Sequence, residues 1–187
     1  MIFRGFFGGD RKKEEDFDPL ADLALENMKL GYLVDYDMKT WEVTARHCYD
    51  WGEGRSSQEW ELRSADEVIY LEREGDDDAE WCVSRKVRVA DITPDVRRSI
   101  AASDDPPERV TFEGVAYELE SDRAGYFHRN TPRLSEAKGQ GQQLITWSFI
   151  DASGQRFLAL EQWGEREFEA AAGSAAEEFQ FNHILPR

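Results

Sequence analysis

Residues 60–81, WELRSADEVIYLEREGDDDAEW, decide the fold, because a second version of them follows later in the chain. Residues 147–168 read WSFIDASGQRFLALEQWGEREF, and five large apolar residues of the first stretch meet a large apolar counterpart 87 positions on. The matched pairs are Trp60 and Trp147, Leu62 and Phe149, Tyr70 and Phe157, Leu71 and Leu158, Glu74 and Glu161, and Trp81 and Phe168. The chain therefore contains an internal repeat.

Each version has the sequence pattern of a β-meander. An alternating apolar segment leads to a small polar turn, a second apolar segment ends in Glu, and another turn leads to a third strand. We predict a mainly β fold in which two related antiparallel meander halves form one barrel-like or sandwich unit, with one or two short helices. The two halves are expected to share an apolar interior.

The domain organisation follows from the repeat. We predict an N-terminal tail over 1–18, a first β half over 19–90, a linker with a short helix over 91–109, and a second β half over 110–187. With 187 residues, the chain is long enough to bury an ordinary core as a single compact domain.

Local signals refine this outline. A short helix is expected over 20–29, after Asp18-Pro19, and another from Asp95 to about residue 102. The period-2 pattern places Trp41, Val43 and Ala45 on one face of a strand. Residues 178–184 alternate as a final strand that caps or closes the sheet.

The segment 129–143 is where the two halves differ most. It is rich in Gly, Gln and Ser, and it makes the second half longer than the first. A binding site peculiar to one half is expected at this loop.

The charge balance excludes one class of partner. A formal charge of −16 and a pI near 4.6 disfavour nucleic acid, whose phosphates are bound by Lys and Arg that release counterions. Such acidity also keeps an aromatic-rich β protein soluble and discourages edge pairing. We therefore expect the protein to bind a protein partner and not nucleic acid.

Cysteine usage and hydropathy indicate a location. Cys48 and Cys82 are the two cysteines, and their spacing is that of neither a disulfide framework nor a zinc site. The sequence shows no secretory signal pattern and no apolar run near the ~20 residues of a membrane span. We expect a cytoplasmic protein, two cysteines in or near the core, and no metal or cofactor.

The N-terminal tail carries Phe3, Phe6 and Phe7 close to four basic residues. Such a segment suits weak, reversible contact with an anionic inner-membrane surface. The alternatives are packing on the domain and an oligomer contact, and the oligomeric state stays open.

Residues that carry chemistry are sparse. His128 stands at the mouth of the long loop, where a ligand would arrive. Glu74 and Glu161 are the acids that the repeat pairs, and they converge only if the halves face each other across a two-fold axis; the simpler expectation is that each stays solvated at a strand end. No residue is assigned to catalysis.

The aromatic residues Trp41, Trp60, Trp147 and Phe157 suit either of two places. They line a barrel interior that takes an apolar ligand, or they simply fill the core.

Several short patterns together resemble a known family. They are Leu30-Gly31 leading to Trp41-x-Val43, Glu59-Trp60-x-Leu62, Tyr70-Leu71-x-x-Glu74, Gly114-x-x-Tyr117-x-Leu119, and Leu158-x-Leu160-Glu161-x-Trp163. Over about 28–183, the chain resembles a β-rich bacterial domain-of-unknown-function family that is often encoded near phage-shock-type membrane-stress proteins. The resemblance supplies no catalytic residues. It implies a cytoplasmic accessory or interaction protein, and it also implies that this protein acts at the inner membrane surface.

Three functions follow from these observations. The first is a non-enzymatic binding or scaffold protein, accessory to a bacterial membrane-associated or envelope-stress assembly. The second is a carrier that holds an apolar small molecule or lipid between the two β halves. The third is an enzyme that uses its paired carboxylates.

Overall fold

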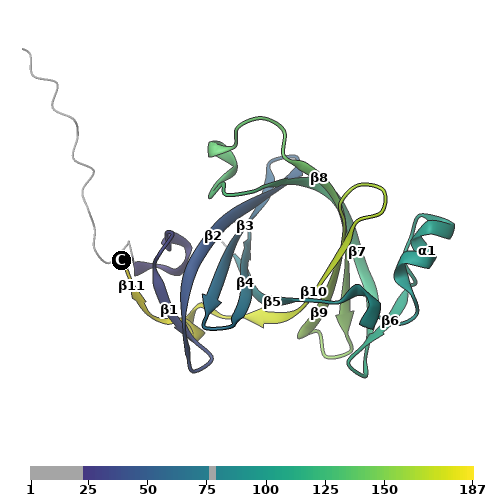
Figure 1. Cartoon of the computed structure of the whole chain (residues 1–187), viewed down its shortest axis with the longest axis horizontal. Coiled ribbons are helices and arrows are strands. Elements are labelled where there is room, and N and C mark those ends of the chain that lie inside the picture. Colours follow the sequence, from purple (N-terminus) through teal and green to yellow (C-terminus); the bar gives the residue numbers. More distant parts are fainter. Residues whose placement is uncertain (1–22, 76–78) are drawn as a thin grey trace, which may run out of the picture.

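The computed structural model describes residues 23–75 and 79–187, and it shows a closed antiparallel β-barrel with additional strands on two sides (Figure 1). The first five strands are β1 (Leu33–Tyr36), β2 (Lys39–Gly52), β3 (Arg55–Ser64), β4 (Glu67–Glu74) and β5 (Glu80–Val87). The other six are β6 (Arg109–Phe112), β7 (Val115–His128), β8 (Gln142–Asp151), β9 (Arg156–Gln162), β10 (Phe168–Ala176) and β11 (Asn182–Leu185). The mainly β, barrel-like prediction is confirmed.

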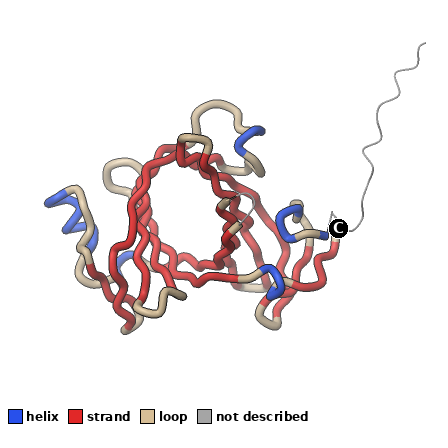
Figure 2. The backbone as a smooth tube through the Cα atoms, turned by 180° about the vertical axis from the view of Figure 1, so that it is seen from behind, coloured by secondary structure: helices blue, strands red, loops and turns tan. Residues whose placement is uncertain are grey.

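Two pairings between the halves close the barrel. Residues Cys48 to Asp50 of β2 pair with Tyr126 to His128 of β7, and β5 pairs with β10. The closed ring runs β2-β3-β4-β5-β10-β9-β8-β7 and back to β2. Figure 2 shows this ring of strands from behind. The flanking pairs β1–β11 and β6 extend the sheet outward from β2 and β7.

The helical segments lie outside this ring (Figure 1). The α-helix α1 (Val96–Ser103) begins after Asp95, whose carboxylate accepts hydrogen bonds from the amides of Arg97 and Arg98, so the helix expected in the linker is confirmed. The short 3₁₀ turns are η2 (Leu25–Asn27), η3 (Val89–Asp91), η4 (Leu134–Glu136) and η5 (Glu178–Gln180).

The helix expected over 20–29 is wrong for its described part. Only the turn η2 forms there, and the chain is already extended at Met28. Leu25 and Met28 are both buried, three residues apart, which is the spacing of a 3₁₀ turn on an apolar surface. Residues 20–22 lie outside the described residues.

The strand expected over 178–184 forms only in its last part, as β11 over 182–185, because residues 178–180 form the turn η5. β11 pairs with β1, so that Leu185 lies opposite Leu33, at the outer edge of the sheet. The strand caps that edge and takes no part in closing the barrel, which β2 and β7 accomplish.

The two runs of five strands correspond closely. β2 and β7 each have 14 residues, and β3 and β8 each have 10. Both β2 and β7 carry a bulge at the same place, after Val43 paired with Leu62 and after Leu119 paired with Phe149.

The spacing of 87 does not hold for the middle strand of the meander. Trp60 pairs with Leu71, whereas Trp147 pairs with Leu160, which lies 89 positions after Leu71. The turn between β8 and β9 is longer, and a shift of two residues leaves the same side chains on the same face. The structural counterpart of Glu161 is therefore Glu72, and not Glu74.

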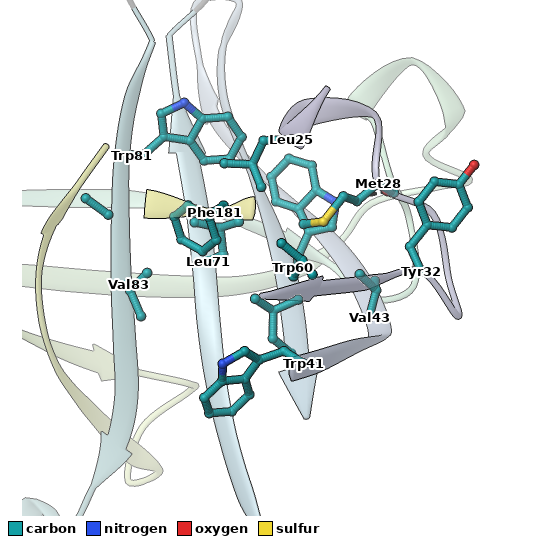
Figure 3. Close-up of a cluster of buried hydrophobic side chains, with 13 residues drawn as sticks. Leu25, Met28, Tyr32, Trp41, Val43, Trp60, Leu71, Trp81, Val83 and Phe181 are labelled. Atoms are coloured by element: carbon teal, nitrogen blue, oxygen red, sulfur yellow. Dashed lines mark hydrogen bonds between the residues drawn. The ribbon is translucent and has the colours of Figure 1, made fainter. Parts of the chain in front are cut away.

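Most buried apolar residues form two clusters outside the barrel wall, and a third, smaller cluster of Tyr49, Trp51, Phe127 and Leu144 lies on the inner face. The β1 cluster lies between the wall and the β1–β11 side (Figure 3), and the α1 cluster lies beside η3, α1 and β6. The β1 cluster contains Leu25, Met28, Tyr32, Val34, Trp41, Val43, Trp60, Leu62, Leu71, Trp81, Val83, Ala176 and Phe181. The α1 cluster contains Val89, Ile92, Val96, Ile100, Val110, Phe112, Tyr117, Trp147, Phe149, Leu158, Leu160 and Ala170.

The expectation of one apolar interior shared by the two halves is wrong for most of the core, although the small cluster on the inner face is built by both halves. Trp41 and Trp60 belong to the β1 cluster and Trp147 to the α1 cluster, so each half has its own core on the outer face of the wall. Phe157 is on the inner face.

Candidate functional site in the barrel lumen

Two cavities, of about 750 and 520 Å³, lie on the inner face of the wall. Their lining residues come from all eight strands of the ring, which only the lumen of the barrel can bring together. Tyr49 lines both cavities, and we call them cavity 1, which reaches η3 and α1, and cavity 2, which reaches the ends of β4 and β10. Volumes of this size are typical of small-molecule sites.

The lumen is polar because the strands alternate. On β3, Trp60 and Leu62 belong to the β1 cluster, and Glu59 and Glu61 line cavity 1. The side chains of successive residues point to opposite faces of a strand, so an apolar outer face leaves these acids facing inward.

Two acids of the lumen are direct neighbours across strands. Glu59 of β3 lies opposite Glu72 of β4 in the register, with Glu59 lining cavity 1 and Glu72 lining cavity 2. Burial first, and then the charges of Glu72 and Glu161, raise the pKa of Glu59 to about 8. Burial also raises the pKa of Glu72, although the Ser57 hydroxyl opposes the shift. At neutral pH the pair therefore holds a proton.

Tyr49 lies in the lining of both cavities. Its hydroxyl donates to a carboxylate oxygen of Glu59 at 3.2 Å, and its ring stacks on Trp51 with centroids 5.2 Å apart. Phe127 packs against the same ring at 5.0 Å. Burial raises the pKa of Tyr49 well above its ordinary value, so the phenol remains a donor at neutral pH.

Lys86 and Arg123 bring positive charge into the lumen, each held by carboxylates and a ring. The Lys86 ammonium lies 3.2 Å from Glu161 and 2.6 Å from Glu169, and 5.5 Å from the centre of the Tyr70 ring. Burial alone would lower the pKa of Lys86, but the carboxylates outweigh it and raise that pKa.

Arg123 repeats this arrangement on the other side of the lumen. Its guanidinium donates to Glu74 at 2.6 Å and lies 4.4 Å from the centre of the Trp51 ring. Carboxylates with an aromatic face are a recognised environment for organic cations.

The two cavities differ in charge. The described lining of cavity 1 has four Glu residues against Lys86 and three Arg residues, which balance. The described lining of cavity 2 has six Glu residues against two Arg residues. Those six acids are Glu72, Glu74, Glu80, Glu120, Glu161 and Glu177. Cavity 2 therefore favours positively charged occupants.

The two acids selected by the repeat meet in one cavity. Glu74 and Glu161 both line cavity 2. The expectation that both stay solvated is wrong for Glu161, which is buried and paired with Lys86. Glu74 keeps partial exposure and pairs with Arg123.

The other predicted residues lie elsewhere. His128 is buried at the end of β7, outside the described lining of both cavities, and a side chain at Gly141 would lie 3.0 Å from its ring. The loop thus covers His128. Phe3, Phe6 and Phe7 lie outside the described residues.

Other candidate reactive groups are unsuited to nucleophilic chemistry. Burial raises the pKa of the Cys82 thiol well above its usual value and that of Cys48 to about 11. His47 lines cavity 1, but its Nδ1 accepts a hydrogen bond from the Asn130 amide, and burial lowers its pKa. Cys48 is fully buried and Cys82 partly so, as expected of core or near-core cysteines.

The described part of the chain has neither a group of metal ligands nor a membrane-spanning helix. Within 23–75 and 79–187, no three His, Cys, Asp or Glu side chains are grouped as metal ligands. In the same residues, no helix has the length and apolar character to cross a bilayer.

Comparisons with known proteins identify relatives. The model of the family described as Domain of unknown function (DUF4178) matches residues 29–178. An uncharacterized protein of Aquifex aeolicus (strain VF5) is 28% identical over 177 residues, which covers 95% of this chain and 93% of that protein. No solved structure matches.

Proposed function

The chain belongs to the DUF4178 family, as its resemblance predicted, and from this premise we propose that it is a non-enzymatic binding protein that holds a small polar molecule in its barrel lumen. The polar lumen carries the proposal. Eight-stranded barrels have interiors just wide enough for side chains to fill or for one small ligand. Here the two larger apolar clusters lie outside the wall, and cavities remain inside.

The cost of this lumen supports a binding role. Burying carboxylates costs free energy unless they are paired, and an apolar interior of the same volume would be more stable. Glu59 and Glu72 lie side by side across β3 and β4, and this arrangement lowers the stability of the fold. Residues that destabilise a fold are typical of functional sites, because function is what retains them.

Binding is favoured over catalysis by the state of the reactive groups. The thiol of Cys82 is held protonated, and His47 has its Nδ1 engaged by a backbone amide. A catalytic nucleophile needs an adjacent base or a lowered pKa. The paired acids Glu74 and Glu161 are each neutralised by a basic side chain, which suits charge balance in a binding site more than proton transfer.

An apolar ligand remains the second candidate because of one group of side chains. Tyr49, Trp51, Phe127 and Leu144 form an apolar cluster with Trp163 packed against it, and four of these five residues line a cavity. An aromatic wall of this kind suits a flat or aliphatic molecule. The carboxylates beside it favour a ligand that also carries polar groups.

The biological setting forms a further part of the proposal. We place the protein in a bacterial cytoplasm, accessory to a membrane-associated or envelope-stress assembly, with an unidentified protein partner. The free cysteines and the family membership support this setting. We also propose that the two halves arose by duplication, which the matched strand lengths and bulges of β2 and β7 support.

Capture of metabolites tests the proposed function. The full chain is incubated with a bacterial metabolite extract, separated by size exclusion, and analysed for released small molecules. Ala159 lines cavity 2, so Ala159→Trp fills the lumen, and Ala116→Trp places the same side chain on an exposed position of β7 as the matched control. We expect capture by the native chain and by Ala116→Trp, and loss in Ala159→Trp.

The opposite results would count against a binding lumen. Equal capture by the native chain and folded Ala159→Trp places the ligand elsewhere. If the large side chain prevents folding, Ala159→Met provides a smaller obstruction with a correspondingly partial loss. No capture by any variant contradicts the proposal.

A further inference from the structure

The wall of the lumen has an acidic pair on β3 and β4 for which the described residues supply no ion-pair partner. Glu59 and Glu72 are direct cross-strand neighbours, and none of the ion pairs found among residues 23–75 and 79–187 includes either of them. Like charges placed directly opposite each other destabilise a sheet. A proton or a cation beside the two carboxylates relieves this repulsion.

The chain itself shows how this lumen accommodates cations. Lys86 is held by Glu161, Glu169 and the Tyr70 ring, and Arg123 by Glu74 and the Trp51 ring. In both places, carboxylates supply charge and an aromatic ring supplies a face. The stacked rings of Tyr49 and Trp51 lie beside the acidic pair in the same way, with the Tyr49 hydroxyl 3.2 Å from Glu59.

Cavity 2 has Glu72 and Tyr49 in its lining, while Glu59 lines cavity 1, and cavity 2 has the volume for more than a single ion. It holds about 520 Å³, and its described lining has six carboxylates against two guanidinium groups. The carboxylates are distributed along β4, β5, β7, β9 and beyond β10 instead of converging as metal ligands. A molecule with several atoms between its charges satisfies such a distribution better than one ion does.

We propose that Glu59 and Glu72 bind the ammonium group of a small organic amine whose chain lies in cavity 2. The proposal rests on the proposed function and specifies its ligand. One ammonium group contacts the acidic pair and Tyr49, and the aliphatic part lies along the aromatic rings. A second ammonium group is accommodated by the remaining carboxylates of cavity 2, so a diamine binds more tightly than a monoamine.

Binding of the amine is coupled to release of a proton. Burial and neighbouring acids raise the pKa of Glu59 to about 8, and an aliphatic ammonium with a pKa of about 10 stays charged throughout this range. Glu59 must lose its proton to pair with the ammonium. The affinity therefore rises about tenfold per pH unit up to pH 8 and then levels off.

The groups around the pair come from several strands, and they contribute to this titration. Those facing Glu59 or Glu72 are His47 and Tyr49 on β2, Glu74 on β4, Cys82 and Lys86 on β5, Arg123 on β7, and Glu161 on β9. Lys86 opposes the rise in the pKa of Glu59, and Arg123 opposes that of Glu72. Burial lowers the pKa of His47, so His47 is neutral where Glu59 titrates.

Calorimetric titration of the full chain tests the proposal. The probes are 1,4-diaminobutane, butylamine, 1,4-butanediol and magnesium chloride, at pH 6 and pH 8 and at two salt concentrations. We expect 1,4-diaminobutane to bind more tightly than butylamine, with about 50-fold higher affinity at pH 8 than at pH 6. The diol and magnesium chloride are expected not to bind.

Matched variants locate the site. Glu59→Gln and Glu72→Gln preserve side-chain size, and each is expected to weaken 1,4-diaminobutane at least tenfold. Glu108→Gln removes the same charge at an exposed position outside the described lining of both cavities, and it is expected to bind as the native chain does. Thermal melting of each variant verifies the fold. Proton release is measured by repeating the titration in buffers of different ionisation enthalpy.

Three results would overturn the proposal. They are the absence of 1,4-diaminobutane binding, equal weakening in Glu59→Gln and Glu108→Gln, and tighter binding of magnesium chloride than of the diamine. If metabolite capture succeeds while the amines fail, the lumen binds another class of molecule and only this proposal falls. If both fail, the binding function falls as well.

Discussion

Replacement of Glu59 by Gln is expected to stabilise the protein in the absence of any ligand. The substitution preserves the shape of the side chain and removes an ionisable group opposite Glu72. Most substitutions in a protein interior destabilise it. A gain in stability would mark Glu59 as a residue retained for function at the expense of the fold.

The magnitude follows from the raised pKa of Glu59. The pKa is about 8 in the folded chain against an ordinary value of 4.5. Between these values the folded chain keeps the proton and the unfolded chain does not, so stability falls as pH rises and levels off above pH 8. At pH 7 the loss amounts to about 3 kcal/mol, from 1.36 kcal/mol per pKa unit. Glu59→Gln avoids this loss.

Thermal and urea unfolding at pH 5 and pH 7.5 measure the effect. For a chain of this size, about 3 kcal/mol corresponds to roughly 6 to 12 °C in Tm. We expect the native chain and Glu59→Gln to differ little at pH 5, and the variant to be the more stable at pH 7.5. If the free energy of unfolding changed with pH in the same way for both proteins, the reasoning would be refuted, because Glu59 would then titrate as an ordinary carboxyl group.

Two further substitutions separate the outer clusters from the lumen. Trp60→Ala is expected to lower the free energy of unfolding in urea by about 3 to 5 kcal/mol. The reason is that Trp60 is fully buried in the β1 cluster and its indole donates to the Met28 carbonyl. A loss below about 1 kcal/mol would contradict a core outside the wall. Lys86→Met is expected to cost about 1 to 2 kcal/mol, since it leaves Glu161 without its ion-pair partner while partial exposure of Lys86 softens the penalty. Raising the salt concentration to 0.5 M should reduce this difference, and an unchanged difference would show that packing, and not charge, is lost.

The meander architecture was predictable because strand signals are local. Alternating large apolar residues, polar turns and the repeat sufficed to place β3, β4, β5 and their counterparts. The helix α1 was predictable for the same reason, since Asp95 caps its first turn. Closure of the barrel through β2 and β7 depends on pairing between distant segments, which no local pattern specifies.

The site was missed because alternation does not distinguish the inside of a barrel from its outside. Trp60 and Leu62 mark one face of β3 as buried, and Glu59 and Glu61 mark the other as polar. A polar face ordinarily faces solvent. Here the β1–β11 strands cover the apolar face from outside, so the acids face the lumen. Lys86, whose ammonium meets acids of two other strands, is not distinguishable from a surface lysine in sequence.

The bulges in β2 and β7 explain how single strands serve both a core and the lumen. Before the bulge in β2, Trp41 and Val43 point into the β1 cluster. After it, Tyr49 and Trp51 line the cavities, although both have the same odd numbering as Trp41. One extra residue in the strand reverses which face the odd positions occupy.

The bulge in β2 also explains why Ala45 does not share a face with Trp41 and Val43, as the sequence pattern had predicted. A strict period of two from Trp41 would carry Ala45 and every later odd residue into the outer cluster, but the register shifts between Val43 and Ala45. The equivalent shift in β7 lies between Leu119 and Ser121, and it turns Arg123 and Phe127 inward. Both bulges are needed, because the lumen receives its aromatic wall from β2 and β7 together. Because the same bulge occurs in both halves, the polar lumen is a consistent feature of the fold and not a local defect. The function is therefore best inferred from the carboxylates that line this lumen.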